Sequence, residues 1–420
     1  MQKIVGNPKL QLNLFMPFTW QAKDIGRNKM RFTLIPRFKP FLGFSEFIRI
    51  FLLARSDAVS KFEQEFAKKM RQKYAIAFPY GRTGLIFLLK SLGLEGKEII
   101  CPAYTCVVVP HAIVFSGNIP VFVDSQLKDF NMDLDLVEEA ISNKTSAIIA
   151  TSIFGNPVNL DRLAEIKKKY PHIHIIQDCA HSFGAEWDGV RVNTAGVAAI
   201  YGLNVSKIIT SVFGGMVTTD SKDVYENLKV FLKENLKPIG RAKSLKRRLY
   251  LLTIYMAFNS FIYSVVDFLE RHGFLNRFVK YFDEKKIDMP SDYLDMMSPF
   301  EAEIGAIQTK KYDEIIAKRR NIGYLYDELL EKPKEMGKTF SHYPVLVSNR
   351  KKVLSDARKN GIQLGTIIDY SCENMQVYKE YRFVTRDHVV DRLRKHMVNL
   401  PMVDMKKEQR EELQRILCIV

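Results

Sequence analysis

The nine residues Ile173-His-Ile-Ile-Gln-Asp-Cys-Ala-His181 decide how this 420-residue chain folds. The first five form a short, mostly apolar run, which is typical of a strand buried on both faces of a sheet. A helical pattern at Leu160–Tyr170 and another apolar run at Ser146–Ser152 precede it. Strands that alternate with helices predict a mostly parallel sheet with helices on both faces. Because ligands bind at the carboxyl ends of such strands, we expect Asp178 and His181 at a binding site.

The same alternation continues on both sides of this stretch and sets the domain organisation. Further strands are predicted at Ile99–Cys101, Pro120–Val123, Val197–Tyr201 and Met216–Thr219. We expect an α/β fold in four parts. They are an N-terminal extension rich in basic and aromatic residues (1–57), a large α/β domain (58–235), a basic and apolar helical insertion (236–298), and a long helix at Pro299–Leu330 leading into a small α+β domain (299–420).

Composition limits the classes of protein to which the chain can belong. With 47% hydrophobic and 26% charged residues, it is typical of a globular protein. Its cysteines are widely spaced and contain no C-x-x-C pair, which argues against a zinc finger, a redox motif or a disulfide scaffold. They are Cys101, Cys106, Cys179, Cys372 and Cys418. We read no signal peptide at the N-terminus and expect a reducing, cytoplasmic location.

The net charge of +16 is concentrated in two segments. Residues 1–57 carry a net +7 and residues 236–290 a net +6, so the main body is not basic enough to predict nucleic-acid binding. The cluster Arg241–Arg248 is followed by Leu249–Val266, which are 18 uncharged residues. A basic cluster beside an apolar run indicates monotopic contact with an anionic membrane surface. Burial against another protein, or a true membrane span, also fits the pattern.

Two further motifs carry chemistry. Tyr80-Gly-Arg-Thr-Gly84 precedes a predicted helix, and a glycine turn that opens a helix suits a phosphate, although many such turns bind nothing. Ser206-Lys207 lies between apolar runs and is followed by Phe213-Gly-Gly-Met216. Partial burial lowers the pKa of a lysine and makes its neutral amine available for Schiff-base chemistry. Asp178 taken alone is an equally good helix N-cap.

The order of the motifs along the chain is more informative than any single motif. Pro102-Ala-Tyr-Thr105 and Phe154-Gly-Asn-Pro157 lie between the glycine turn and Asp178, and Asn399-Leu-Pro-Met402 comes near the end. This arrangement resembles the DegT/DnrJ/StrS-type aminotransferases, which are pyridoxal-phosphate enzymes of the aspartate aminotransferase superfamily. The resemblance implies fold type I, with a mixed, mostly parallel, seven-stranded sheet in the large domain. It also implies pyridoxal 5'-phosphate as cofactor and no metal.

The resemblance assigns roles residue by residue. Lys207 would form the Schiff base and then shuttle the proton, while Asp178 would keep the pyridine nitrogen protonated. His181 would contact the side of the ring that carries the phenolic oxygen. These three are the expected catalytic residues. The expected cofactor-binding set adds the phosphate-contacting residues and one ring-facing position: Gly81, Arg82, Thr83, Ser206 and Cys106.

The sequence also departs from the family pattern. Cys106 stands where an aromatic ring usually stacks on the cofactor, and Ile208 stands where Asn is common. The Asn-Tyr-Arg-Met motif is replaced by Asp295-Met-Met-Ser298. Tyr370 is the nearest candidate for the role of the usual histidine-rich loop. The cofactor chemistry is therefore mostly kept, while substrate recognition is changed.

The function implied by the resemblance is transfer of an amino group from glutamate or glutamine to a keto-sugar. We expect the sugar to be linked to a nucleotide or a lipid, in cell-surface polysaccharide or glycolipid synthesis. We expect a homodimer in the cytoplasm, in peripheral contact with the inner face of the cytoplasmic membrane. Related sugar dehydratases have histidine in place of the lysine, so Lys207 argues against that activity. An inactive or regulatory scaffold of the same fold at the membrane is the alternative from another class.

Overall fold

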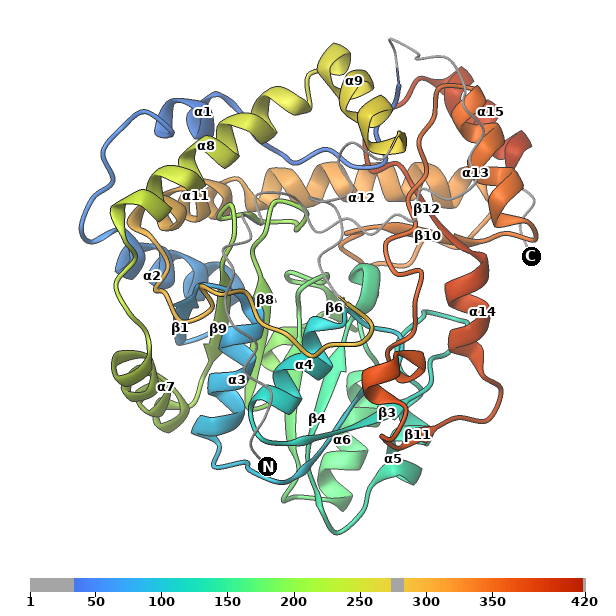
Figure 1. The fold of residues 1–420 in the computed structure, drawn as a ribbon. Coiled ribbons are helices and arrows are strands. Elements are labelled where there is room, and N and C mark those ends of the chain that lie inside the picture. Colours follow the sequence, from blue (N-terminus) through green and yellow to red (C-terminus); the bar gives the residue numbers. More distant parts are fainter. Residues whose placement is uncertain (1–33, 273–282, 418–420) are drawn as a thin grey trace.

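An eight-stranded sheet lies at the centre of the large domain (Figure 1). The structure is a computed structural model that describes residues 34–272 and 283–417. All neighbouring strands are parallel except β9, which is antiparallel to both of its neighbours. In spatial order the strands are β1 (Tyr74–Phe78), β9 (Gly215–Thr219), β8 (Ala198–Gly202), β5 (His174–Asp178), β4 (Thr145–Thr151), β2 (Glu98–Pro102), β3 (Ile119–Val123) and β11 (Phe383–Val384).

The predicted α/β fold class is confirmed. The sheet has eight strands where seven were expected, and the two strands at its edges were not identified from the sequence. All six apolar runs identified in the sequence are strands. The seventh strand, β1, follows the helix Ala58–Met70 directly and was not identified from its residues. The eighth, β11, comes from the C-terminal part and pairs with β3 through Phe383 and Phe122. It escaped notice because two residues give no alternation to detect.

Helices cover both faces of the sheet. The helices α2 (Ala58–Met70), α5 (Leu134–Ala140) and α6 (Leu160–Lys169) share one apolar cluster with it. The helices α3 (Gly81–Ser91), α4 (Val108–Phe115) and α7 (Lys222–Asn235) share the other. In α2 the buried residues Phe62, Phe66 and Met70 recur every four positions, so one stripe of the helix faces the sheet.

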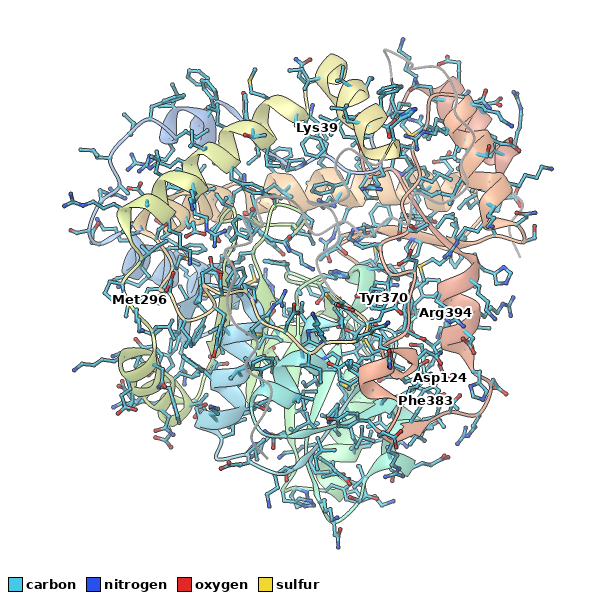
Figure 2. All side chains as sticks on the ribbon, in the orientation of Figure 1. Lys39, Asp124, Met296, Tyr370, Phe383 and Arg394 are labelled. Atoms are coloured by element: carbon cyan, nitrogen blue, oxygen red, sulfur yellow. The ribbon has the colours of Figure 1, made fainter. Side chains whose placement is uncertain are left out.

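The C-terminal part forms the predicted small α+β domain. The expected long helix is two successive helices, because the regular helix stops at Lys311, whose φ and ψ are −85° and 0°. The carboxylate of Asp124, next to β3, accepts hydrogen bonds from the N–H groups of Val389 and Val390 and so joins this domain to the sheet (Figure 2). The elements are α11 (Pro299–Lys310), α12 (Tyr312–Leu329), β10 (Tyr343–Leu346), α13 (Arg350–Lys359), α14 (Val389–His396), β12 (Met397–Leu400) and α15 (Lys407–Ile416).

The insertion is helical, as expected. It comprises α8 (Arg241–Ala257) and α9 (Ser260–Arg271), and α8 lies beside the short helix α1 (Phe44–Arg49) of the N-terminal extension (Figure 1). Within the described residues no single helix is long and apolar enough to cross a membrane. Residues 241–257 and 262–269 meet that test only as a pair bent by 105°. Residues 1–33 and 273–282 of the two basic segments, and Cys418, lie outside the described residues.

Substitution of a glycine in α11 tests how closely α2 packs against α11. A Cβ at Gly305 would lie about 2.7 Å from Cε1 of Phe62, which is fully buried. We expect Gly305→Ala to lower the free energy of unfolding by about 1–2 kcal/mol, because overpacking outweighs the gain in helix propensity. Urea unfolding measures this change. The exposed substitution Lys310→Ala on the same helix is the control, and a Gly305→Ala variant more stable than the parent would contradict the packing described.

Candidate active site

The carboxyl ends of β5 and β8 open on a cavity of about 140 Å³. That volume is roughly ten times what one buried water needs, so the cavity accommodates a small molecule. The N-terminus of α3 and three residues of the small domain, Ile367, Ile368 and Tyr370, also line it. Seven of the eight residues proposed from the sequence meet here: Gly81, Arg82, Cys106, Asp178, His181, Ser206 and Lys207.

Asp178 lies on the floor of this cavity as the last residue of β5. One carboxylate oxygen accepts a hydrogen bond from the Ala180 N–H at 3.0 Å, and the other accepts one from the Thr151 hydroxyl at 3.2 Å. Burial raises its pKa, while the Ala180 N–H and the nearby Lys207 amine act in the opposite direction. The two donors fix the orientation of the buried carboxyl group, which lies where it could bind a protonated ring nitrogen.

Lys207 lies in the turn that follows β8. Its backbone N–H donates to the Asn204 carbonyl at 3.0 Å, and the Asn204 side chain accepts from the Ser206 N–H at 3.0 Å, so this turn is well defined. Burial lowers the pKa of the Lys207 amine, opposed by Cys106 and Asp178. A lowered pKa increases the neutral, nucleophilic fraction of the amine near neutral pH.

His181 lies in a cluster of aromatic rings at one side of the cavity. Its Nδ1 accepts from the Phe154 N–H at 3.4 Å, and the two rings are stacked with centroids 6.0 Å apart. Burial, followed by the charges of Lys207 and His342, holds the pKa of His181 well below its usual value. The ring is therefore neutral near pH 7. His342, from the small domain, has its ring centroid 5.2 Å from that of His181.

The N-terminus of α3 forms the second end of the cavity. A Cβ at Gly81 would lie 2.9 Å from the Tyr201 carbonyl oxygen, so only glycine lets this turn pack so closely on β8. Tyr80 is the N-cap and provides no side-chain cap for the first turn. The N–H groups of this first turn and the positive end of the helix dipole therefore suit an anion. Thr83 was expected here, but it does not line the cavity and its hydroxyl donates to the Tyr293 carbonyl at 2.9 Å.

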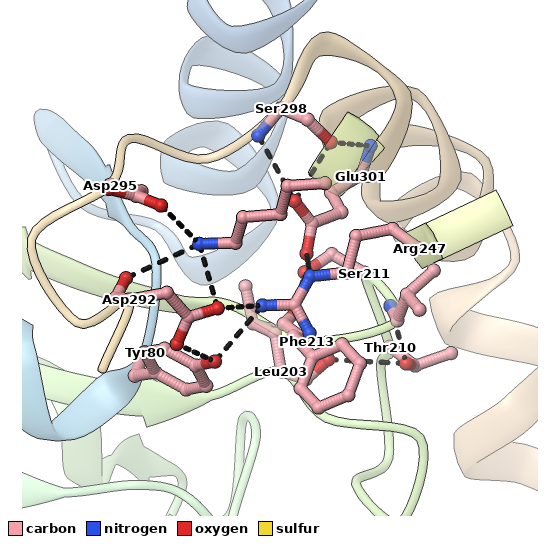
Figure 3. A network of polar contacts seen from close by, with 12 residues as sticks. Tyr80, Leu203, Thr210, Ser211, Phe213, Arg247, Asp292, Asp295, Ser298 and Glu301 are labelled. Carbon is pink, nitrogen blue, oxygen red and sulfur yellow. Dashed lines mark hydrogen bonds and ion pairs between the residues drawn. The ribbon is translucent and has the colours of Figure 1, made fainter. Parts of the chain in front are cut away.

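The insertion reaches the same end of the cavity through Arg247 (Figure 3). Nη2 of Arg247 donates to the Tyr80 hydroxyl and to Asp292, both at 3.0 Å. Its guanidinium carbon lies 3.7 Å from the ring centroid of Phe213, and its Nε lies 3.4 Å from a carboxylate oxygen of Glu301. Arg247 therefore ties α8 to the turns on either side of the anion-binding end.

This network was not predicted from the sequence. Arg247 and Lys243 belong to the basic cluster for which membrane contact was expected, but both side chains bind carboxylates of the protein. Nζ of Lys243 lies 2.7 Å from Asp292 and 2.9 Å from Asp295. The helical spacing of Lys243 and Arg247 with the buried residues Leu251 and Ile254 was the available signal, because all four occupy one face of α8.

Comparison with known proteins identifies the group to which the chain is related. A profile of the DegT/DnrJ/EryC1/StrS aminotransferase family matches residues 50–418. The chain belongs to this family. An uncharacterised protein of Methanocaldococcus jannaschii is 26% identical over 363 residues, which are 81% of this chain and 84% of that protein. The GDP-perosamine synthase of Escherichia coli is 33% identical over 184 residues, which are 44% of this chain and 50% of the synthase.

The fold agrees with this membership. The solved structure of the E. coli GDP-4-keto-6-deoxy-D-mannose-3-dehydratase with bound hydrated pyridoxal phosphate matches with a TM-score of 0.72 and 19% identity, covering 92% of this chain and 99% of that one. The chain spans about half the length of the sugar transaminases that it matches in sequence. As a family member, it is a pyridoxal-phosphate-dependent aminotransferase.

The cavity residues of this aminotransferase fit pyridoxal phosphate. Lys207 would provide the amine for the aldehyde, Asp178 would be the partner of the ring nitrogen, and the N-terminus of α3 with Arg82 would bind the phosphate. The Ser206 hydroxyl donates to Asn204 at 2.5 Å, so it would exchange that partner to bind a phosphate. The roles given to individual residues remain predictions.

Cys106 remains the clearest departure from the family pattern, and Tyr370 is the aromatic ring beside it. Tyr370 also lines the cavity, and its hydroxyl accepts a hydrogen bond from the Val107 N–H at 3.0 Å (Figure 2). This contact fixes the small-domain segment that carries Tyr370 against the Cys106 turn. We therefore expect Tyr370, rather than residue 106, to cover the ring of the cofactor.

Replacing the buried carboxylate tests the site. We expect Asp178→Asn to lower the rate of amino transfer at least about 100-fold, because a neutral amide cannot hold a protonated ring nitrogen. The rate of 2-oxoglutarate formation from L-glutamate measures the effect. Glu63→Gln is the matched control, because Glu63 is also a partly buried carboxylate but lies on α2 and does not line the cavity. Equal rates for Asp178→Asn and the parent would contradict the assignment.

Proposed function

We propose that this aminotransferase moves an amino group from glutamate to a keto-sugar in the synthesis of cell-surface polysaccharide or glycolipid. The observation that carries the proposal is the joint placement of Lys207 and Asp178 in one cavity, beside the N-terminus of α3. The names of relatives, such as GDP-perosamine synthase, support a sugar carried on a nucleotide as the acceptor.

Each residue of the site has a defined task in this reaction. When bound, pyridoxal phosphate supplies an electron sink that stabilises negative charge on the carbon that exchanges its proton. Asp178 holds the ring nitrogen protonated through a charge-assisted hydrogen bond. Lys207, as a neutral amine, takes the proton from the donor carbon and returns it on the cofactor side. Because the His181 ring is neutral, it can form a hydrogen bond in the cavity without repelling a cationic amino group.

The acceptor and the cellular setting complete the proposal. A keto-sugar linked to a nucleotide is favoured by the relatives, and a lipid-linked keto-sugar is favoured by the apolar insertion beside the cavity. We place the reaction in the cytoplasm, at the inner face of the membrane, and infer a homodimer from family membership. The presence of Lys207 favours amino transfer over sugar dehydration and over an inactive scaffold, because neither alternative requires an amine beside Asp178.

Isotope transfer tests the function. We expect L-[15N]glutamate to yield 2-oxoglutarate and a 15N-labelled amino-sugar when a nucleotide-linked 4-keto-6-deoxy sugar is supplied, with mass spectrometry as the readout. Lys207→Ala should retain the fold and lose at least about 100-fold of the rate, because the proton shuttle is absent. Cofactor binding without any 2-oxoglutarate from glutamate or glutamine would contradict an aminotransferase and favour the scaffold.

A further inference from the structure

One face of the protein carries most of its exposed apolar side chains. Among residues 34–272 and 283–417, fourteen large hydrophobic side chains are exposed, and eight of them lie in two short segments. We name these eight residues the α1–α8 face: Phe44, Ile48, Phe51, Leu52 and Leu53 in and after α1, and Leu245, Leu249 and Met256 in α8. Large exposed apolar patches on soluble domains mark interaction sites.

The two segments form one continuous surface. Nη1 of Arg248 donates to the carbonyls of Ile50 at 2.6 Å and Leu52 at 2.8 Å, and the ring centroids of Phe47 and Tyr255 are 4.9 Å apart. Beneath them, Ile50 and Tyr250 share one buried cluster. Figure 1 shows α1 beside α8 at the upper left. The exposed side chains therefore lie on a well-packed part of the fold and not on an unsupported loop.

The charges of these two segments that are not buried are positive, and Arg49 and Arg55 among them are paired with Glu303 of α11. Residues 34–56 and 241–259 contain a single carboxylate, Glu46, which is fully buried and paired with Lys311 at 2.7 Å. The next one along the chain, Asp57, is paired with Lys61 at 2.5 Å. Arg241 and Lys246 on α8 are exposed. The surface therefore attracts anions around an apolar centre.

The cations of α8 lie in three settings, and Arg248 bonds the backbone that follows α1 as described above. Lys243 and Arg247 point toward the cavity end and are neutralised by Asp292, Asp295 and Glu301. Arg241 and Lys246 stay on the outside with Leu245 and Leu249. A helix with an apolar stripe and flanking cations on its outer surface is typical of one that lies in the membrane interface.

We propose that the α1–α8 face docks on a membrane surface that contains anionic phospholipids. The apolar side chains enter the boundary between headgroups and acyl chains, while Arg241 and Lys246 contact lipid phosphates. A second copy of the chain fits the face less well, because a two-fold interface would bring the same cations together. The docking deepens the location proposed for the reaction, but it needs no amino transfer, so the two proposals can fail separately.

Vesicle sedimentation with the holoenzyme tests the docking. The probes are vesicles of phosphatidylcholine alone and of phosphatidylcholine with phosphatidylglycerol, at low and at high salt. We expect binding to the anionic vesicles that weakens at high salt, because screening reduces the contribution of the cations. No binding to anionic vesicles at low salt would overturn the proposal, whatever the isotope experiment shows.

Two matched double variants locate the contact. Phe51→Glu with Leu53→Glu alters residues that are 63% and 92% exposed, and we expect binding at least about tenfold weaker. Val230→Glu with Met336→Glu alters residues 52% and 79% exposed elsewhere and should bind like the parent. If the first variant fails to fold, Arg241→Glu with Lys246→Glu replaces it, because both residues are exposed. The visible absorption of the bound cofactor reports the fold.

The mass in solution separates a membrane from a second copy of the chain. Light scattering should give the same mass for the parent and for every variant. A lower mass for a variant of the α1–α8 face would show that this face joins copies and would overturn the proposal. Unchanged vesicle binding by those variants would overturn it equally.

Discussion

The burial of a carboxylate and an amine at one edge of the sheet is the constraint on which the rest of the site depends. The Thr151 hydroxyl and the Ala180 N–H bond the carboxyl group of Asp178, and with the nearby lysine they offset part of the cost of burying it. Parallel strands bring these groups together, since β4, β5 and β8 are neighbours in the sheet. The order of strands thus fixes where the chemistry takes place.

The sequence revealed the parts of the site that follow regular strands. Asp178, His181 and Lys207 directly follow short apolar runs, and the carboxyl ends of such runs meet in any mostly parallel sheet. Thr83 could not be placed in the same way, because the partner of its hydroxyl, the Tyr293 carbonyl, lies 210 residues away. Periodicity along the chain gives no information on such contacts. The contact of Tyr370 with Val107 was hidden for the same reason. The strand β11 was missed because its two residues are too few to show an alternation.

The insertion has two surfaces with different tasks. Its inner surface carries Arg247, whose guanidinium group contacts Tyr80, Phe213 and two carboxylates near the phosphate end of the cavity. Its outer surface carries Leu245, Leu249 and Met256, the part of the α1–α8 face that lies in α8. Net charge alone could not separate these groups, because both belong to the same basic cluster. Only their positions around the axis of α8 distinguish a structural cation from one that is free to meet a lipid phosphate.

The proposed reaction requires Lys207 to hold the cofactor opposite Asp178. Borohydride reduction of the holoenzyme, followed by peptide mapping with mass spectrometry, tests this most directly, because reduction makes a bond between a lysine and the cofactor permanent. We predict that the added mass of the cofactor is found on the peptide that contains Lys207 and on no other peptide. Modification of a different lysine, or of none in protein that has bound the cofactor, would contradict it.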